Sequence, residues 1–378
     1  MSRVGEYLAR SKSRKDSKPT FAVLGAGHGG LAMAGHLAIM GFPTRLWNRS
    51  RERIDNVNDR DGIEVEGVVE GHGRVDLATD DIGDALDGAD VVMVVVPASA
   101  HRDIAELCAS RLTSKQIVVL NPGRTFGALE FLSVLRQRKV RARPIIAEAQ
   151  TFIYVSRHAE PARARIIQVK NSVPLAAIPA HRTPQVLDIV RSALPQFVAA
   201  SNVLETSLDN IGAIFHPSLT ILNAARIEST HGDFEYYLEG VSPSTAKILE
   251  AADAERVAVG SALGIHLHTA REWLYLAYDS PGKTLYDAIQ ATPGYKGVRA
   301  PATLTHRYIL EDVPMSIVPM ISVGKLAGVK TPTLQGLVHM ASTIHGRDFW
   351  AEGRTVDKVG LSGMSVKDIR MLAVKGVR

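Results

Sequence analysis

The chain is poor in cysteine, in long apolar runs and, beyond its first residues, in excess charge. Cys108 is the single cysteine among 378 residues, which excludes an internal disulfide and a Cys-x-x-Cys metal site and fits a reducing, cytoplasmic setting. No apolar run approaches the ~20 residues that span a bilayer, and the polar first 17 residues do not resemble a secretory signal. We therefore expect no bound metal and no membrane association.

The net charge of +5 is concentrated at the amino terminus. Six Lys and Arg residues stand against Glu6 and Asp16 in the first 20 residues, so the rest of the chain is nearly neutral. Because a nucleic-acid-binding face needs basic residues gathered on the folded domain, we expect no nucleic-acid partner. We interpret residues 1–18 as a flexible, solvated basic tail, with a weak anionic partner as the alternative.

The two halves of the remaining chain differ in pattern. Residues 19–198 alternate amphipathic stretches with short β-branched apolar runs, which are typical of parallel strands covered on both faces. The runs are 21–24, 44–47, 91–96 and 117–120. This alternation predicts a doubly wound, Rossmann-type α/β domain that binds a dinucleotide.

Helix signals dominate residues 199–378. Ser242-Pro243 and Thr331-Pro332 each place a proline at a first helical position, and Thr269 with Glu272 forms a capping box. The sequence therefore predicts a mostly α-helical second domain, which we expect to carry the catalytic and substrate residues.

A glycine turn directly follows the first predicted strand and opens a helix. Gly25 permits the tight turn, Gly27 lets the backbone approach a pyrophosphate, and Gly30 allows close packing of helix on strand. His28 and Gly29 complete the turn, and the helix amino terminus adds unpaired N–H groups for the phosphates. These residues predict a nicotinamide dinucleotide site.

The end of the second predicted strand indicates which dinucleotide binds. NAD enzymes commonly carry an acidic residue there for the ribose 2′-hydroxyl, whereas this chain has Asn48, Arg49, Ser50 and Arg51. Because arginines and a hydroxyl can bind a 2′-phosphate that a carboxylate would repel, we predict that NADP(H) is preferred over NAD(H). The alternative is that both arginines are ordinary surface charges.

The loops after the third and fourth predicted strands should line the nicotinamide half of the site, through Pro97 and Asn121. His101, just beyond, could reach substrate or be a solvated loop residue.

His216 is the notable residue of the second half. It precedes Pro217 within an apolar helical run, and a proline there removes a hydrogen bond and bends the chain. Further on, Arg307 and Asp312 are five residues apart and would not share one face of a regular helix. Their element must break if both point into one site, as Pro314 suggests.

The chain resembles the octopine/nopaline-type opine dehydrogenases, and most closely the bacterial N-(1-D-carboxyethyl)-L-norvaline dehydrogenase branch. The resemblance covers nearly all of the chain beyond the tail. It rests on the motifs Asn121-Pro122-Gly123, Phe215-His216-Pro217, Leu222-Asn223-Ala224-Ala225-Arg226, Tyr236-Tyr237-Leu238-Glu239-Gly240, Arg307-Tyr308 and Glu311-Asp312-Val313.

The resemblance implies that an amino acid and a 2-oxo acid condense and that NAD(P)H reduces the resulting imine to an opine. The family's catalytic His–Asp pair maps onto His216 and Asp312, and its carboxylate-binding arginine onto Arg307; Glu311 is the alternative partner of the histidine. Asn223, seven residues after His216, is a candidate donor to substrate. A homodimer is the default expectation.

Two rival functions stay open at this point. One is an NADP-dependent 2-oxo acid reductase of ketopantoate-reductase-like architecture, since such enzymes combine the same two kinds of domain. The other is a non-enzymatic NADP(H)-sensing protein, which would leave His216, Arg307 and Asp312 without a role.

Overall fold

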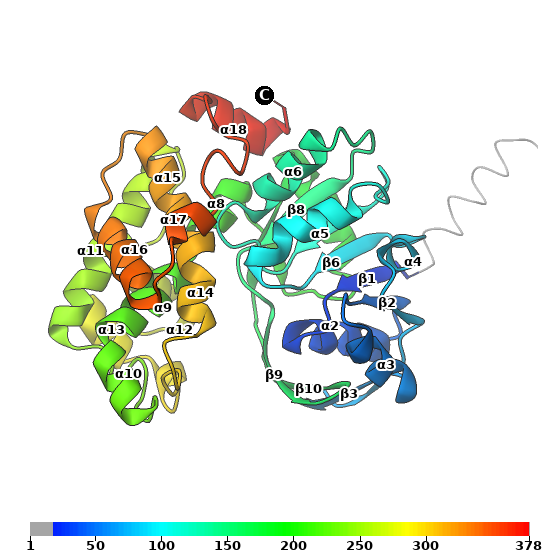
Figure 1. Cartoon of the computed structure of the whole chain (residues 1–378), viewed down its shortest axis with the longest axis horizontal. Helices are drawn as coiled ribbons and strands as arrows, with labels where there is room; N and C mark the ends of the chain where they lie inside the picture. The colour runs from blue at the N-terminus through cyan, green and yellow to red at the C-terminus, as the bar shows by residue number, and fades with distance from the viewer. Residues whose placement is uncertain (1–17, 378) are drawn as a thin grey trace, which may run out of the picture.

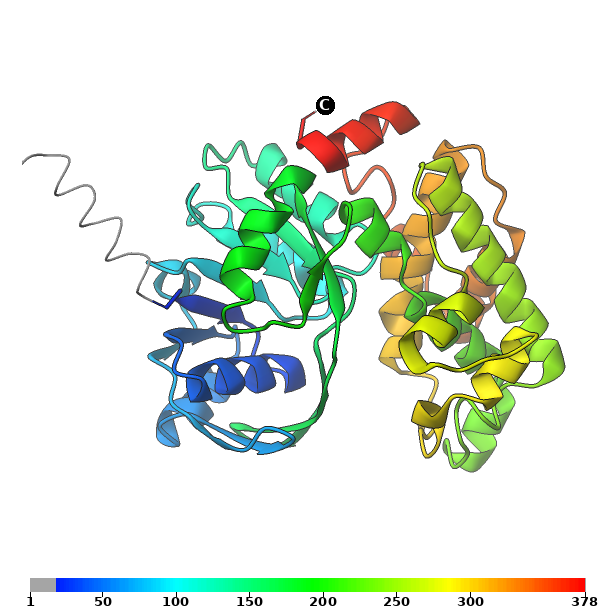
Figure 2. The ribbon, with the colours of Figure 1, turned by 180° about the vertical axis from the view of Figure 1, so that it is seen from behind.

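The protein, described by a computed structural model over residues 18–377, consists of a sheet lobe and a helical lobe (Figure 1, Figure 2). The predicted basic tail falls outside these residues except for Lys18, whose Nζ donates to Met40 O at 2.8 Å. The sheet lobe ends with strand β12 (Phe197–Ala199), and the helical lobe starts with helix α8 (Val203–Leu208).

The sheet lobe is built on eight strands in the order β12-β11-β8-β7-β6-β1-β2-β5, all parallel to their neighbours except β11 against β8. The strands besides β12 are β1 Phe21–Leu24, β2 Thr44–Trp47, β5 Leu77–Thr79, β6 Val91–Val94, β7 Ile117–Leu120, β8 Ile145–Ala149 and β11 Val173–Ile178. All four predicted strands are present, and β6 ends two residues earlier than predicted. Alternate side chains of β1 enter two separate apolar cores, Ala22 and Leu24 on one face and Phe21 and Val23 on the other. Burial on both faces explains the continuous apolar runs.

A second sheet, which the sequence analysis did not predict, has the order β4-β3-β10-β9. Its strands are β3 Ile63–Gly67, β4 Gly71–Gly73, β9 Tyr154–Glu160 and β10 Arg163–Val169. One face packs on helix α2 (His28–Ile39), so buried residues such as Ile63 and Val65 alternate with partly exposed ones. This half-exposed pattern lacks the long apolar runs by which the other strands were recognised.

Helices cover both faces of the large sheet and form most of the second lobe. In the sheet lobe they are α2, α3 Arg51–Asp59, α4 Ile82–Leu86, η1 Ala98–Ala100, α5 His101–Cys108, α6 Gly127–Gln137, η2 Ala180–Arg182 and α7 Thr183–Val190. From α8 onward they are α9 Gly212–Leu222, α10 Ala224–Thr230, α11 Pro243–Ala262, α12 Ala270–Tyr278, α13 Leu285–Gln290, η3 Pro293–Tyr295, α14 Arg307–Leu310, η4 Val313–Ile317, α15 Val318–Leu326, α16 Pro332–His345, α17 Phe349–Glu352 and α18 Val366–Lys375.

The predicted helix starts are confirmed. Helices α11 and α16 begin at Pro243 and Pro332, and both bonds of the capping box between Thr269 and Glu272 are formed at α12. None of the helices between residues 18 and 377 has the length and apolar character to cross a membrane.

The last helix, α18, leaves the helical lobe and packs on β11 and η2 of the sheet lobe. Figure 1 shows it above the junction of the two lobes. Arg136 Nη2 donates to Gly376 O at 2.8 Å just beyond its end. The chain therefore joins the lobes twice, through the β12–α8 connection and through its carboxyl end.

Candidate active site

The glycine turn has the geometry of a phosphate cradle. Gly25 has φ +117°, and a Cβ added there would lie 2.4 Å from Val95 O; one added at Gly30 would lie 1.6 Å from Gly25 O. At Gly27 the atom nearest an added Cβ is Arg53 Nη1, 3.9 Å away, so the backbone faces open space. Helix α2 begins at His28 directly after its N-cap residue Gly27, which has no side chain to cap it, so an anion can approach this amino terminus.

Residues beyond β2 brace this turn. Asn48 Oδ1 accepts from Ala26 N at 3.1 Å, and Arg53 Nη1 donates to Ala26 O at 3.1 Å. Arg53 was not predicted from the sequence as a site residue, although it lies in the first turn of α3, directly after the residues predicted to bind the 2′-phosphate. The guanidinium of Arg53 adds a positive charge on the open side of the glycine turn.

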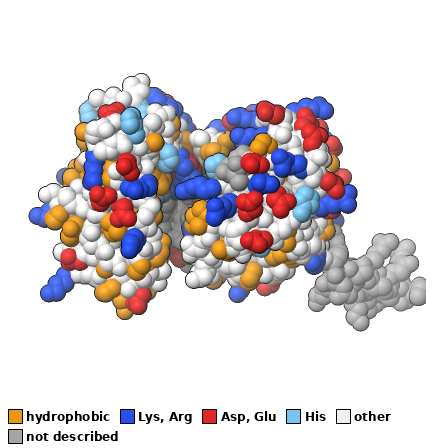
Figure 3. Space-filling model, turned by 90° about the horizontal axis from the view of Figure 1, so that it is seen from below, with side chains coloured by type: hydrophobic (Ala, Val, Ile, Leu, Met, Phe, Trp, Pro, Cys, Tyr) orange, Lys and Arg blue, Asp and Glu red, His pale blue; other side chains and the backbone are white. Residues whose placement is uncertain are grey.

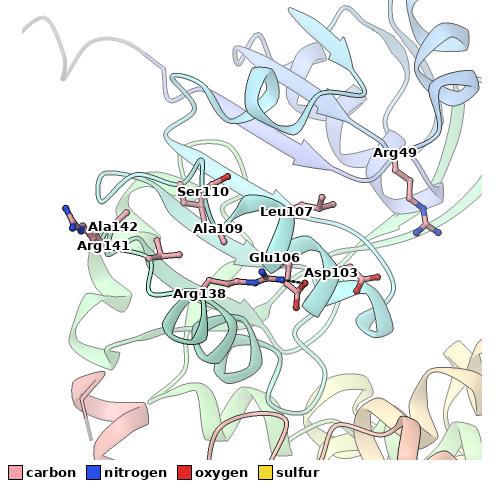
Figure 4. Close-up of a pocket in the computed structure, with 11 residues that line it drawn as sticks. Arg49, Asp103, Glu106, Leu107, Ala109, Ser110, Arg138, Arg141 and Ala142 are labelled. Carbon is pink, nitrogen blue, oxygen red and sulfur yellow. Dashed lines mark hydrogen bonds and ion pairs between the residues drawn. The ribbon is translucent and has the colours of Figure 1, made fainter.

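Arg49, Ser50 and Arg51 differ in their surroundings. Ser50 is the N-cap residue of α3, and its hydroxyl caps none of the helix N–H groups. The Arg51 side chain is 78% exposed and lies 3.9 Å from Asp55 Oδ2. Arg49 lines a surface hollow of about 930 Å³ beside α5 and α6. Figure 4 shows it at one end of this hollow, apart from the Arg138–Glu106 pair.

The loops after β6 and β7 meet at the same edge of the sheet. Pro97 is exposed and precedes η1. Asn121 is buried and donates to Val119 O at 2.9 Å, and its Oδ1 has no hydrogen-bond partner among residues 18–377. An unpaired buried oxygen at this edge fits a donor supplied by a ligand.

His101 is neither a substrate contact nor a solvated loop residue, the two alternatives weighed from the sequence. It is fully buried, and its Nδ1 accepts from Arg354 Nη2 at 3.2 Å. Burial, with the charges of Arg354 and Arg124, holds the pKa of His101 well below its ordinary value. Arg354, which enters from the helical lobe, also donates to the carbonyls of Ala98 and Thr125, so it ties these two loops together.

The helical lobe presents His216 and Asp312 as a hydrogen-bonded pair. His216 Nδ1 donates to Asp312 Oδ2 at 2.9 Å; the histidine side chain is 18% exposed and the aspartate fully buried. Burial lowers the pKa of His216, which the bond to Asp312 counteracts only in part. The imidazole is therefore neutral near pH 7, with Nδ1 occupied and Nε2 left for proton transfer.

Asp312, not Glu311, is the partner of His216, and Arg124 contacts both carboxylates. Arg124 is buried, with Nη1 3.0 Å from Asp312 Oδ1 and Nε 3.4 Å from Glu311 Oε1. Glu311 also accepts from Ala98 N at 3.2 Å. Burial opposes ionisation of Asp312, but Arg124 and the bond from His216 bring its pKa below the ordinary value. Arg124 therefore stabilises the anion that orients the histidine.

Arg307 and Asp312 lie on opposite sides of a break in their helix. Helix α14 ends at Leu310, Glu311 lies in a turn, and Asp312 precedes the π-helical turn η4 of Val313–Ile317, which α15 continues. The predicted break is therefore present, between Leu310 and Asp312. The Arg307 side chain is 61% exposed, with Nε 3.8 Å from Glu311 Oε2, so its guanidinium is open to solvent and to a ligand.

Two tyrosines contact His216, one at its ring and one at its main-chain carbonyl group. Tyr308 stacks on the His216 ring at 4.0 Å between centroids and 16° between planes. Tyr236 is fully buried, and its hydroxyl group donates to His216 O at 2.7 Å. Helix α9 runs from Gly212 to Leu222 with Pro217 inside it, so the tyrosine anchors the backbone of the residue that carries the imidazole.

Asn223, which was predicted to contact substrate, is hydrogen-bonded within the protein. Asn223 ends α9, and its Nδ2 donates to Leu219 O and Gly240 O, both at 2.9 Å. Both amide protons are therefore used within the protein, which argues against Asn223 as a donor to substrate.

The site lies where the two lobes face each other. The space-filling view in Figure 3 shows a groove between them, with Lys and Arg side chains along its margin. Such a positive rim favours anionic ligands such as carboxylates and phosphates.

Comparison with known proteins agrees with this arrangement. Residues 199–345 match the family described as NAD/NADP octopine/nopaline dehydrogenase, alpha-helical domain, and residues 20–133 match the amino-terminal part of NAD-dependent glycerol-3-phosphate dehydrogenase. An opine dehydrogenase of Arthrobacter sp. (strain 1C) is 40% identical over 93% of this chain and 98% of that protein.

Two solved structures share the whole fold. An octopine dehydrogenase with NADH and L-arginine has a TM-score of 0.80 and 21% identity, and the match covers 96% of this chain and 99% of that one. A yersinopine dehydrogenase with bound NADP+ has a TM-score of 0.70 and 17% identity, over 92% of this chain and 93% of that one.

Proposed function

The chain belongs to the octopine/nopaline dehydrogenase family and is an NAD(P)-dependent oxidoreductase acting on CH–NH bonds; from that premise we propose its substrates and residue roles. It condenses the amine of an amino acid with a 2-oxo acid of the pyruvate or 2-oxoglutarate class and reduces the imine to an N-carboxyalkyl amino acid. The observation that carries this proposal is the buried His216–Asp312 pair beside the open Arg307 guanidinium.

The residues present fit a nicotinamide dinucleotide. Gly25, Gly27 and Gly30 with the amino terminus of α2 would hold its pyrophosphate, since the Gly27 backbone is open. A bound nicotinamide cofactor supplies the hydride for the reduction. We assign the 2′-phosphate of NADP(H) to Arg49 and Ser50, since no carboxylate ends β2 to repel it. Related structures hold either NADH or NADP+, so the family does not decide this preference.

His216 moves the protons of the condensation. Its neutral Nε2 takes a proton from the substrate amine, whose nitrogen then attacks the carbonyl carbon of the 2-oxo acid. His216 Nε2 then returns the proton to the hydroxyl group of the addition product as water leaves and the C=N bond forms. Asp312 holds the tautomer with Nδ1 protonated, as its 2.9 Å contact requires.

Arg307 binds the 2-oxo acid carboxylate, because a planar guanidinium can do so through two parallel hydrogen bonds. Closure of the lobes around both substrates would keep water from hydrolysing the imine. We further propose that the protein works in the cytoplasm and as a homodimer.

The decisive experiment measures oxidation of NADPH and of NADH with pyruvate or 2-oxoglutarate, alone and with a panel of amino acids. We expect turnover only with both substrates present and a higher kcat/KM for NADPH. Turnover with the 2-oxo acid alone would identify a 2-oxo acid reductase instead.

A matched pair of variants tests the cofactor assignment. Arg49→Ser should lower the NADPH preference by about tenfold or more, since a charge-assisted contact is lost. Arg141→Ser, at another point of the same hollow, should leave it unchanged. Preference for NADH in the unaltered enzyme would contradict the assignment.

A further inference from the structure

Lys170 is a basic residue of the sheet lobe that comes close to the catalytic residues. It directly follows β10, where the chain leaves the second sheet. Its Nζ donates to Thr151 Oγ1 at 2.7 Å. Thr151 lies just beyond β8, at the carboxyl edge of the large sheet, where ligands bind in such folds.

The neighbouring loop connects this lysine with the glycine turn. Phe152 follows Thr151, and its ring lies so close to Gly29 that an added Cβ would meet it at 2.9 Å. The Lys170 main-chain N–H donates to Ile153 O at 2.9 Å, which holds the lysine on this loop. Lys170 is therefore placed beside the amino terminus of α2, on the sheet-lobe side of the cleft.

The charges around Lys170 are those of the active site. Burial, followed by the charges of Arg124 and Arg307, lowers the pKa of Lys170 to about 8. Arg124 and Arg307 are therefore close enough to Lys170 for their charges to disfavour its ammonium form.

Only one of these cations is fully neutralised. Arg124 lies within ion-pair distance of both Asp312 and Glu311, and Arg307 lies near Glu311 alone. Lys170 forms no ion pair with any carboxylate of residues 18–377. A partly buried ammonium without a counter-ion is costly unless an anion arrives with the ligand.

We propose that Lys170 binds the α-carboxylate of the amino-acid substrate, while Arg307 binds the carboxylate of the 2-oxo acid. This inference rests on the proposed function, in which each substrate brings one carboxylate and the product retains both. Arg124 is unsuited to this role because the protein already provides its counter-ions. Lys170 belongs to the sheet lobe and Arg307 to the helical lobe, so the two carboxylates are held from opposite sides of the cleft.

The test compares Lys170→Met and Lys170→Arg with a control, Lys247→Met, on the exposed face of α11. Steady-state kinetics are measured with the amino acid varied, with the 2-oxo acid varied, and with the same amine lacking its carboxylate. We expect Lys170→Met to raise KM for the amino acid by about tenfold or more, as loss of a charged hydrogen bond predicts. KM for the 2-oxo acid should change less than about threefold, Lys170→Arg should restore part of the loss, and Lys247→Met should match the parent.

The amine without a carboxylate makes the test specific. It should be a poor substrate of the parent enzyme, and Lys170→Met should handle it as the parent does, because the missing carboxylate and the missing ammonium remove the same contact. An equal penalty on both amines, or a larger rise in KM for the 2-oxo acid, would overturn the assignment.

If Lys170→Met does not fold, the parent enzyme alone decides, because equal kcat/KM for the two amines would refute the carboxylate contact. Absence of any condensation by the parent would overturn the proposed function together with this inference. Normal condensation with unchanged Lys170→Met kinetics would overturn the inference alone.

Discussion

Asp312→Asn should separate the chemistry of the site from its binding. The substitution keeps the size of the side chain and removes its charge. In the parent, Asp312 Oδ2 lies 2.9 Å from His216 Nδ1 and Oδ1 lies 3.0 Å from Arg124 Nη1. The variant therefore loses the anion that orients His216 and one of the two counter-ions of a buried arginine.

The size of each loss follows from these contacts. A positioned acid–base group is worth about 10²- to 10⁴-fold in rate, so kcat/KM should fall by that factor, or about 3 to 5 kcal/mol. Breaking a buried ion pair costs about 3–5 kcal/mol of unfolding free energy, and because Glu311 still faces Arg124 we expect the lower end of that range. Without the nearby anion, the pKa of His216 should also fall further, moving the acidic limb of the pH–rate profile to lower pH.

Glu311→Gln is the matched control, since Glu311 contacts Arg124 and the Ala98 N–H but does not touch His216. Kinetics over a pH series and urea unfolding of both variants supply the two readouts. The control should lose stability while keeping the parental acidic limb. If Asp312→Asn stays within about threefold of the parent in kcat/KM, below the range for a positioned acid–base group, or if both variants shift the profile alike, the role of Asp312 is refuted.

Two further predictions concern the glycine turn and acid stability. Gly27→Ala should raise the cofactor Kd about tenfold or more while leaving stability nearly unchanged, since the added methyl meets only Arg53 Nη1 at 3.9 Å and would block a pyrophosphate. Gly30→Ala should instead lower the unfolding free energy by about 3 kcal/mol or more, because the added methyl group would force the backbone to move. Fluorescence titration measures the cofactor Kd and urea unfolding measures the stability of each variant. Equal stability of the two variants would contradict this packing. Burial and the charge of Arg354 hold the pKa of His101 well below 6.5 in the folded state, so the unfolded chain binds more protons below that pH. Stability should therefore fall as pH drops below 6.5, by up to about 1.4 kcal/mol per unit for this group, and His101→Asn, with an amide oxygen in place of Nδ1, should reduce that slope in urea titrations; an unchanged slope would exclude His101 as a source.

Features governed by neighbouring residues could be predicted from the sequence. The glycine turn between strand and helix, the proline starts of α11 and α16 and the capping box of α12 follow from backbone sterics and from hydrogen bonds within a few residues. The family resemblance added His216, Arg307 and Asp312 as a set, since their motifs lie far apart along the chain.

The remaining features of the site depend on packing between residues that lie far apart in the sequence. Only the fold brings Arg124 of the sheet lobe against Asp312 and Glu311, and only tertiary packing places Asp312, not Glu311, against His216. Likewise the unpredicted second sheet returns the chain to the cleft at Lys170. Pairing of charges and burial depends on distances between residues remote in sequence, which no local pattern encodes; local chemistry determined the elements, and tertiary packing determined which charges meet.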